Sequence, residues 1–431
     1  MPGPAVPLPL RLYGAAADLL GPIAYGRVQR KLKAHGTDPG RWRERMGHAT
    51  LPRPAGRLVW FHAASVGESA SVLPLIAHWG RAQPQTEFLI TSGTATSAEM
   101  LARRLPPNSR HQFAPLDTRP ALRRFLRHWR PDAGVFVESE LWPQMLRESA
   151  GAGVPLALVN ARLSDRSARH WARAARTARH LMGHFRLIHC QDARTEVNLR
   201  ALGLDRARKG ANLKALSGAL PVDAGARAAL DAQIGDRPVW LAASTHPGEE
   251  EIVLDAHRRL LAHLPGALLI VAPRHPERGT DLEVLIAETG LIGARRSIGA
   301  APGPETQVYL ADTLGEMGLW YALCSVTCLC GSFTPAGGHT PYEPAHAGSA
   351  ILHGPLYANF AEVFPALDAA GAGREVTDAE ALSVALARLM ADPGALASMR
   401  QAARGFVAGD AGALDALAAD LIAALAPEDR P

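Results

Sequence analysis

The sequence predicts an α/β protein made of two doubly wound domains, and three features lead to this fold class. The 431 residues exceed the size of one ordinary core and suit two domains of roughly 200 residues each. Apolar residues make up 47% of the chain and charged residues 20%, which is typical of globular proteins. Short apolar runs alternate with longer helical patterns twice along the chain. This alternation indicates two parallel sheets, each buried on both faces.

The predicted strands are short apolar runs rich in aliphatic and β-branched residues. In the first half of the chain, the runs cover residues 58–62, 88–91, 134–138, 156–160 and 187–190. In the second half, they cover residues 239–243, 268–272, 308–310, 326–330 and 350–353. A stretch rich in Gly, Ala and Asp around residues 216–237 separates the two series. We therefore expect residues 36–218 to form one domain and residues 219–431 another, with C-terminal helices that can return to the first domain.

The first 50 residues carry the excess positive charge of the chain. They contain eight Lys or Arg and three Asp or Glu, so the net charge of +5 lies here and the remainder is balanced. This distribution does not match that of a nucleic-acid-binding protein. Residues 12–26 are apolar apart from Asp18, are shorter than a membrane span of about 20 residues, and precede a basic segment. We expect residues 1–35 to interact with an anionic membrane surface; the alternative is a helix packed on the first domain.

The four cysteines indicate a reducing compartment rather than a disulfide framework. Cys324, Cys328 and Cys330 have even numbers, so a strand that ran through all three would place them on one face. We interpret them as buried strand residues rather than as metal ligands. The dinucleotide-binding motif GxGxxG and the P-loop motif GxxxxGK[ST] do not occur, which argues against a dinucleotide dehydrogenase or a P-loop NTPase.

The first candidate site follows the first predicted strand. In a doubly wound sheet, ligands bind at the carboxyl ends of the strands. Here Ser65-Val-Gly67-Glu68 follows the run 58–62, and we expect Gly67 to permit a tight strand-to-helix turn. Glu68 would then lie in the first turn of the next helix and face a cleft between the domains. The residue types support a catalytic base and a carboxylate stabilised by the helix dipole equally well.

A second acidic segment follows the run 134–138. Glu138 and Glu140 are two residues apart, and their like charges require a cationic partner or a proton. The candidate partners are Lys214, Arg162 and the region of Arg166. A structural ion pair is the alternative to a functional role for these carboxylates.

Four polar segments follow strands of the second domain and predict a nucleotide site. Hydroxyl groups, an arginine and a Gly-Gly turn before a helix can hold a phosphate through side chains and backbone N–H groups. Glu343, one turn into that helix, can accept hydrogen bonds from a ribose. The candidate residues are Ser244, Thr245, Pro273, Arg274, Gly315, Glu316, Met317, Gly338, His339, Thr340 and Glu343.

In these segments the chain resembles the Kdo (3-deoxy-D-manno-octulosonic acid) transferases of Gram-negative lipid A biosynthesis. The resemblance runs in order from about residue 40 to residue 370. It includes Ser65-Val-Gly-Glu68, Glu138-Ser-Glu140-Leu-Trp-Pro143, Val159-Asn-Ala-Arg162-Leu-Ser164, Asn212-Leu-Lys214, Ser244-Thr-His246, Arg274-His275, Gly315-Glu316-Met317, Gly337-Gly-His339 and Glu343. So many ordered matches are more specific than any single motif. The resemblance implies the GT-B architecture, in which two doubly wound, Rossmann-like domains face a central cleft.

The same resemblance implies an inverting glycosyltransferase that moves Kdo from CMP-Kdo to a lipid A precursor. It makes Glu68 the general base and assigns Glu138 and Lys214 to stabilisation of the transition state. The first domain would bind the acceptor and the second the CMP-sugar. Positions matching CMP-binding residues of the family are Pro273, Arg274, Gly315 to Met317 and Thr340 to Glu343. The residues expected on the acceptor side are Ser65, Gly67, Glu140 and Arg162.

The family further implies transfer without a metal or other cofactor, at the cytoplasmic face of the bacterial inner membrane. Two departures from its pattern affect these expectations. Thr340 replaces the usual Asn after Gly-Gly-His, and Ala211 is inserted into the usual Gly-Asn-Leu-Lys. One alternative is therefore a diverged GT-B transferase or an epimerase that uses another nucleotide sugar. The other is an inactive, membrane-associated protein that binds a nucleotide.

Overall fold

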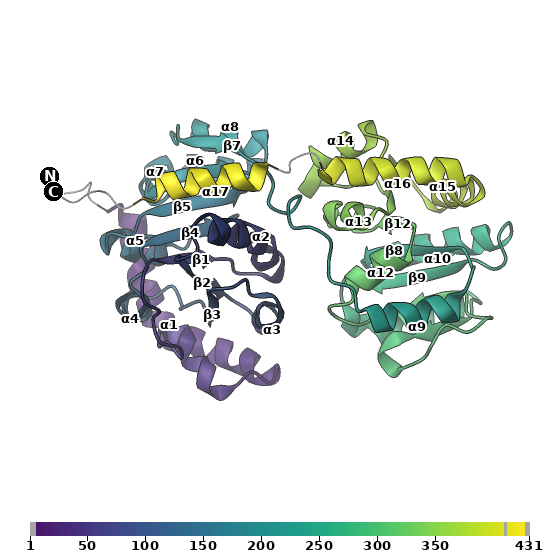
Figure 1. The fold of residues 1–431 in the computed structure, drawn as a ribbon, viewed down its shortest axis with the longest axis horizontal. Coiled ribbons are helices and arrows are strands. Elements are labelled where there is room, and N and C mark those ends of the chain that lie inside the picture. The colour runs from purple at the N-terminus through teal and green to yellow at the C-terminus, as the bar shows by residue number, and fades with distance from the viewer. Residues whose placement is uncertain (1–5, 409–411, 427–431) are drawn as a thin grey trace. The chain divides into compact units, whose positions relative to one another are not determined.

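The computed structural model describes residues 6–408 and 412–426, which form two compact α/β units. Of the described residues, 6–217 and 412–426 belong to unit 1, and 218–408 belong to unit 2. Each unit contains one seven-stranded sheet whose paired strands are all parallel (Figure 1). The predicted fold class of two doubly wound domains is confirmed.

The sheet of unit 1 has the strand order β3-β2-β1-β4-β5-β6-β7. Its strands are β1 (Leu58–His62), β2 (Glu87–Ser92), β3 (Ser109–Phe113), β4 (Ala133–Val137), β5 (Leu156–Ala161), β6 (Phe185–Cys190) and β7 (Ala207–Lys209). The five runs predicted in this half of the chain correspond to β1, β2, β4, β5 and β6. Strand β3 escapes prediction because its sequence is mostly polar, and β7 because it has only three residues.

Buried side chains cover both faces of this sheet. Along β1, Leu58 and Trp60 belong to one hydrophobic core, and Val59 and Phe61 belong to another. Successive side chains of a strand point to opposite faces, so both faces of β1 are buried. The covering helices are α1 (Leu8–Ala34), α2 (Val66–Ala82), α3 (Ala95–Arg104), α4 (Arg119–Trp129), α5 (Pro143–Gly151), α6 (Asp165–Ala172), α7 (Ala175–Met182), α8 (Ala193–Ala201) and α17 (Ala413–Ala424), with the 3-10 helix η1 (Pro39–Met46).

Helix α17 belongs to unit 1, although unit 2 precedes it in the chain. It lies beside α2 (Figure 1), where His78 contacts Asp415 at 2.7 Å. Leu417 and Leu421 are buried in the same core as Phe61. The last described helix of the chain therefore completes the core of the first unit.

Helix α1 packs on the rest of unit 1 through two buried leucines and through polar and small residues. The Tyr13 hydroxyl donates to Asp117 at 2.8 Å, and Asp18 accepts a hydrogen bond from Arg119 Nε at 2.6 Å. Gly14 approaches Gln144 so closely that a Cβ at this position would lie 2.6 Å from the amide nitrogen. None of the described helices has the length and hydropathy needed to cross a membrane.

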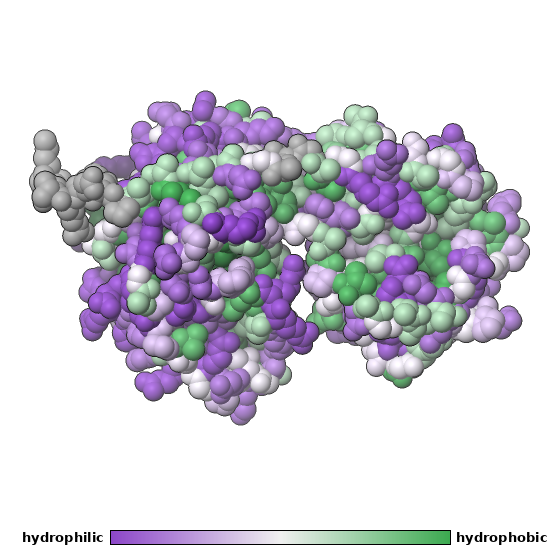
Figure 2. Space-filling model, viewed as in Figure 1, coloured by the Kyte–Doolittle hydropathy of each residue, from purple (hydrophilic) through white to green (hydrophobic). Residues whose placement is uncertain are grey.

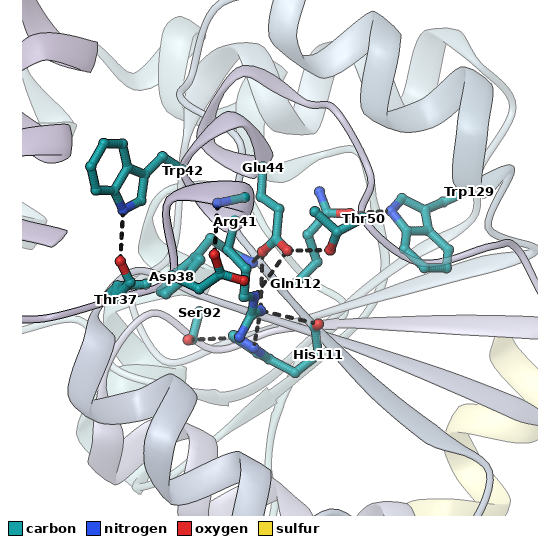
Figure 3. Close-up of polar contacts among 12 residues, drawn as sticks. Thr37, Asp38, Arg41, Trp42, Glu44, Thr50, Ser92, His111, Gln112 and Trp129 are labelled. Atoms are coloured by element: carbon teal, nitrogen blue, oxygen red, sulfur yellow. Dashed lines mark hydrogen bonds and ion pairs between the residues drawn. The ribbon is translucent and has the colours of Figure 1, made fainter. Parts of the chain in front are cut away.

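Buried Glu44 joins η1 to the sheet of unit 1 (Figure 3). Its carboxylate accepts hydrogen bonds from the Arg41 guanidinium at 3.0 Å and from the backbone N–H of Phe113 at 2.7 Å. The same guanidinium lies 2.9 Å from Nδ1 of His111, whose Nε2 lies 2.9 Å from the Ser92 hydroxyl. Burial and the charge of Arg41 lower the pKa of His111 to about 3, so the ring is neutral at pH 7. The segment after α1 is thereby joined to β2 and β3.

The sheet of unit 2 has the strand order β10-β11-β9-β8-β12-β13-β14. Its strands are β8 (Val239–Thr245), β9 (Leu268–Pro273), β10 (Gly293–Arg295), β11 (Val308–Leu310), β12 (Val326–Leu329), β13 (Ala350–His353) and β14 (Gly373–Glu375). The five predicted runs correspond to β8, β9, β11, β12 and β13. Strands β10 and β14 have three residues each, too few to show a pattern.

Helices cover both faces of this second sheet, because Trp240 and Leu241, adjacent in β8, belong to different cores. The helices are α9 (Ala224–Ile234), α10 (Glu249–Leu261), α11 (Gly279–Glu288), α12 (Met317–Leu323), α13 (Tyr342–Ala347), α14 (Val363–Ala369), α15 (Ala379–Ala391) and α16 (Pro393–Ala408). The short 3-10 helices are η2 (Pro276–Arg278), η3 (Arg296–Ile298) and η4 (Ala358–Phe360).

The expectation that three cysteines share one strand face is wrong in one respect. Cys328 lies in β12 and Cys330 directly after it, and both contribute to the same core. Cys324 instead caps the carboxyl end of α12 and packs in the core on the other face. Cys324 is one of the two residues between the end of α12 and the start of β12, so it lies outside the strand. All four cysteines are buried and free.

Candidate functional site

Glu68 lies in the first turn of α2, directly after β1. The Ser65 hydroxyl donates to Glu68 Oε1 at 2.7 Å, and the Ala64 N–H donates to Oε2 at 2.9 Å. The Glu68 N–H lies 3.3 Å from the Ser65 hydroxyl, which completes a capping arrangement of the Ser-x-x-Glu type. The turn holds the half-buried carboxylate in one orientation.

The turn does not require Gly67, contrary to expectation. Gly67 lies within the first turn of α2, and its φ falls outside the left-handed region. A Cβ at Gly67 would meet no atom within 4 Å. The backbone conformation therefore does not require glycine at this position. The open space at Gly67 can instead admit a ligand next to Glu68.

The electrostatic surroundings of Glu68 favour a proton acceptor. Burial raises the pKa of Glu68 above the usual range of a glutamate, and the nearby charges of Glu140 and Glu138 raise it further. The hydrogen bonds from Ser65 and Ala64 act in the opposite direction but do not cancel this effect. A carboxylate whose pKa lies closer to the working pH is a better general base. Glu68 is thus both a helix cap and a group suited to accept a proton.

Glu138 forms an ion pair with Lys214, whose Nζ lies 2.7 Å from Glu138 Oε1. The inserted Ala211 does not prevent this contact. Glu138 directly follows β4 and has a φ of +55°, in a region that L-residues seldom adopt. Asn160 in β5 also has a positive φ, and its Oδ1 accepts a hydrogen bond from the Leu213 N–H at 3.0 Å. Such backbone strain persists where the surroundings enforce it, and it clusters at functional sites.

Glu140 has a different partner from Glu138. Its Oε2 lies 3.3 Å from Nε2 of His62, at the end of β1, and also accepts a hydrogen bond from the Trp142 indole. Burial alone would raise the pKa of Glu140, but the contacts with His62 and Trp142 hold it below the usual value. His62 in turn lies 3.0 Å from the Thr91 hydroxyl in β2. The two carboxylates are therefore held by separate partners.

The other predicted cations lie at the margin of this cluster. The backbone carbonyl of Arg162 accepts a hydrogen bond from the Ser139 hydroxyl at 2.8 Å, which places Arg162 beside the acidic segment. Arg166 lines a surface pocket formed by residues of α6 and the segment after it. Of the predicted partners, Lys214 is paired with Glu138, as described above.

In unit 2, the polar residues after β8 and β9 are joined to each other. The Arg274 N–H donates to the Thr245 carbonyl at 3.0 Å, and the Thr245 hydroxyl donates to buried Glu250 at 2.9 Å. Ser244 has a φ of +59°, the same kind of strained backbone as at the strand ends of unit 1. Pro273 is the last residue of β9. Strands β8 and β9 are neighbours, so these residues share one edge of the sheet.

The candidate donor segment before α12 forms a tight turn. Gly315 has a φ of +86°, which favours glycine, and Met317 is the first residue of α12. Glu316 is already paired, because its carboxylate accepts hydrogen bonds from Arg296 at 2.7 Å and from the Thr313 hydroxyl. The Arg296 guanidinium holds the pKa of Glu316 below its usual value. A ligand would therefore meet the backbone of this turn more readily than the Glu316 side chain.

The loop between β12 and α13 carries the last group of predicted donor residues. His339 Nε2 lies 2.9 Å from Nε2 of His246, which follows β8. The Thr340 hydroxyl is buried and has no hydrogen-bond partner among the described residues, so it can serve a ligand. Glu343 lies in the first turn of α13, as predicted. The four predicted segments thus lie at the carboxyl ends of parallel strands β8, β9, β11 and β12.

Three residues that contact the predicted site were not assigned a role from sequence. His62 contacts Glu140, His246 contacts His339, and Glu249 accepts hydrogen bonds from both loops that carry the histidines. The sequence signal for these histidines is their position near a predicted strand end: His62 ends the run 58–62, and His246 lies three residues after the end of the run 239–243. No sequence signal pairs them with their partners, because the pairing depends on the order of strands in the sheet.

Comparison with known proteins places these features in a family. A family profile described as 3-deoxy-D-manno-octulosonic-acid transferase (kdotransferase) matches residues 40–216. The chain is 35% identical over 437 residues to a 3-deoxy-D-manno-octulosonic acid transferase of Bordetella pertussis, with 94% of this chain and 98% of that protein covered. It is 32% identical over 326 residues to the protein of the same name from Haemophilus influenzae, with coverages of 74% and 75%.

A solved structure supports the fold independently of sequence. A crystal structure of UDP-N-acetylglucosamine 2-epimerase matches with a TM-score of 0.61 and covers 88% of this chain and 99% of its own. The sequence identity is 14%, so this likeness concerns the fold alone. It agrees with two Rossmann-like domains in one chain.

Proposed function

The chain belongs to the family of 3-deoxy-D-manno-octulosonic acid (Kdo) transferases, and we propose that Glu68 is the general base with which it transfers Kdo from CMP-Kdo to a lipid A precursor. The membership makes the chain a glycosyltransferase of lipopolysaccharide biosynthesis. Two features of Glu68 carry the proposal. The Ser65 turn holds its carboxylate in one orientation, and burial raises its pKa.

The proposed reaction inverts the configuration of the anomeric carbon. The acceptor hydroxyl loses its proton to Glu68 while its oxygen attacks that carbon from the side opposite the phosphate. The bond between the carbon and the phosphate oxygen breaks, and its electrons leave with CMP. Glu138 holds the ammonium group of Lys214, which we propose stabilises negative charge in the transition state, and the backbone turns of unit 2 offer N–H groups to the phosphate.

The donor side of the proposal rests on the strand ends of unit 2. Arg274, the unpartnered Thr340 hydroxyl and the turn at Gly315 are groups that can bind a nucleotide phosphate and its sugar. We propose transfer without a metal, because these cations and donors can balance the leaving phosphate. Turnover that is unchanged by EDTA is the expected result, and restoration of EDTA-inhibited turnover by a divalent cation would contradict it.

We further propose that α1 binds the cytoplasmic face of the inner membrane. Several of its apolar side chains are 53% to 79% exposed, and they are Leu8, Leu12, Leu19, Leu20 and Ile23. A basic segment follows within the same helix, and basic residues next to exposed apolar ones suit an anionic lipid surface. Elsewhere on unit 1, hydrophilic residues cover the larger part of the face shown in Figure 2.

Membrane binding can be tested without removing α1, whose Leu10 and Leu32 are buried. Combined Leu12→Gln and Leu19→Gln substitutions should release the protein from vesicles that contain anionic lipid. Leu314→Gln in unit 2 is the matched control, because Leu314 is 71% exposed but lies outside α1. Equal sedimentation of the α1 variant and the control with vesicles would refute the proposed role of α1.

The transfer itself is tested by CMP release. The proposal predicts release of CMP from CMP-Kdo that depends on a lipid A precursor and is lost in Glu68→Gln. A nucleotide-sugar epimerase would instead change the donor with no acceptor present. A protein that binds CMP but never releases it from CMP-Kdo would be the inactive alternative.

A further inference from the structure

His246 and His339 form an in-line pair at the carboxyl ends of the central strands of the second sheet. His246 follows β8 and His339 lies in the loop after β12, and these two strands are neighbours. Their Nε2 atoms are 2.9 Å apart, the ring planes differ by 10°, and the ring centroids are 5.1 Å apart. The rings are therefore nearly coplanar and joined end to end. An N–H···N hydrogen bond in this geometry requires one Nε2 to carry a proton and the other to accept it.

The surrounding backbone is shaped for this pair. A Cβ on Gly331 would lie 2.6 Å from Cδ2 of His339, so only glycine leaves room for the ring. Gly337 and Gly338 both have positive φ values, +88° and +82°, which turn the chain back toward His246. The loop thus depends on three glycines to bring His339 into contact.

Glu249 fixes the two histidine-bearing segments to each other. This carboxylate is fully buried, and it accepts hydrogen bonds from the His246 N–H at 3.0 Å and the Gly331 N–H at 2.7 Å. It also accepts one from the Phe333 N–H at 2.9 Å. One side chain therefore sets the position of the loops on both sides of the pair.

Charged groups around the pair act in both directions. Arg274 and His275 oppose protonation of the pair, and Glu249 and Glu250 favour protonation of His246. Burial, reinforced by positive neighbours, lowers the pKa of His339 to about 4 and also lowers the pKa of His246. The pair is neutral at pH 7 as a result. An anion bound beside Arg274 would offset its positive charge and so favour a proton on the pair.

The pair can accept one additional proton without losing the hydrogen bond between its rings. In the neutral state one ring carries its proton on Nε2 and the other on Nδ1, so one Nδ1 is free of hydrogen. Neither Nδ1 makes a hydrogen bond to a described residue. A proton added there gives an imidazolium and an imidazole that still share the Nε2 hydrogen bond. A second added proton would break this bond, so the pair is suited to gain one charge and no more.

We propose that the His246–His339 pair takes up one proton when a nucleotide phosphate binds at this edge of unit 2. This inference rests on the proposed function, because it assumes that the donor phosphate lies there. During transfer, the acceptor proton goes to Glu68 and the electrons of the broken bond go to the phosphate oxygen. The proton held by the pair then faces the new negative charge of CMP. The pair thus binds the leaving group more tightly as that group forms.

Calorimetric titration with CMP methyl ester tests the proposal, because the charge of this phosphodiester does not change with pH. Titrations at one pH in buffers of different ionisation enthalpy give the number of protons taken up on binding. We expect net uptake that approaches one proton per ligand, and an affinity that strengthens by up to about tenfold per unit as the pH falls from 8 to 6.

His246→Gln and His339→Gln should each abolish this uptake while the ester still binds. His263→Gln is the matched control, because His263 is exposed and is not among the charged groups that act on the pair, so it should leave the uptake unchanged. Wild-type binding without proton uptake would overturn the proposal, as would uptake retained in both pair variants. An absence of any ester binding would instead refute the donor site itself. The wild-type titration decides the main point even if a variant fails to fold.

Discussion

The two sheets present opposite chemistry at equivalent edges. Both are seven-stranded and parallel, and in both the strand order reverses beside the first strand of the unit, β1 or β8. At this point in unit 1, His62 at the end of β1 contacts Glu140 after β4, within a cluster of three carboxylates. At the corresponding point in unit 2, two neutral histidines meet next to Arg274.

The difference shows that the fold determines where a ligand site can form in each unit, and that the residues at the strand ends determine which groups the site offers. A ligand binds where strand order reverses, whichever unit is considered. Unit 1 concentrates negative charge there and raises the pKa of Glu68, which suits removal of a proton. Unit 2 collects groups that can receive a phosphate. The comparison predicts that substitutions at one edge leave the chemistry of the other edge intact.

Glu68→Gln should give the largest effect. The substitution removes the proposed base, so kcat should fall by about a thousandfold, within the range for loss of a general base. CMP binding to unit 2, measured by calorimetry, should not change. Glu148→Gln on α5 is the control, because Glu148 pairs with exposed Arg123 away from the cluster. Normal turnover by Glu68→Gln would show that Glu68 is not the general base.

Lys214→Met should have the next largest effect. It leaves Glu138 without its cation at a strained position, and we expect a loss of about a hundredfold in kcat. Lys214→Arg should restore part of the activity, because a guanidinium can still reach the carboxylate. Lys209→Met, at an exposed edge position, should behave like wild type. Equal activities of the two methionine variants would show that the ion pair has no catalytic role.

Glu44→Gln and Glu249→Gln compare the buried carboxylates that hold each unit together. Each loses an acceptor for buried backbone N–H groups, so the free energy of unfolding of its unit should fall by about 2 kcal/mol. Urea denaturation measures this loss. Only Glu249→Gln should also weaken CMP binding, since Glu249 positions the histidine loops. Weakened CMP binding in Glu44→Gln would show that the two edges are not independent.

The pH dependence of kcat/KM should reflect Glu68. Because burial and neighbouring carboxylates raise its pKa, activity should be lost on acidification at a pH above the usual glutamate value of about 4.3. Glu140→Gln removes one neighbouring negative charge and should move this acidic limb to lower pH by less than about one unit. An acidic limb that stays in place, or moves to higher pH, would exclude coupling between the two carboxylates.

Thr340→Asn should have the smallest effect. It introduces the residue usual in the family at a position whose hydroxyl has no described partner. Since Asn offers an amide in place of a hydroxyl, we expect less than a tenfold change in the KM for CMP-Kdo, with kcat unchanged. A switch to a different nucleotide sugar would reveal that Thr340 determines the donor.

The two sheets and most site positions could be predicted from sequence because each depends on a local pattern. Apolar runs revealed ten strands, and polar residues after them marked both edges. Lys214 was among the candidate partners of Glu138, and the structure pairs them. The contacts between His62 and Glu140, and between His246 and His339, could not be predicted. These contacts join residues at the ends of strands that are far apart in the sequence, β1 with β4 and β8 with β12, and that become neighbours only in the folded sheet.

Other features were hidden for different physical reasons. The three-residue strands β7, β10 and β14 are too short to carry a periodic signal. Cys324 follows the even spacing of the later cysteines by coincidence, since a helix end separates it from β12. The raised pKa of Glu68 depends on burial and on two carboxylates from another loop, whereas its helix position alone favours a lowered value.

Mass spectrometry of the lipid products tests the central claim most directly. Wild-type protein, Glu68→Gln and Glu148→Gln would each be incubated with CMP-Kdo and a lipid A precursor, after calorimetry has shown that all three bind CMP. The account predicts acceptor carrying one or more Kdo residues with wild type and Glu148→Gln, and unmodified acceptor with Glu68→Gln. Kdo-modified lipid formed at equal rates by Glu68→Gln and wild type would contradict it.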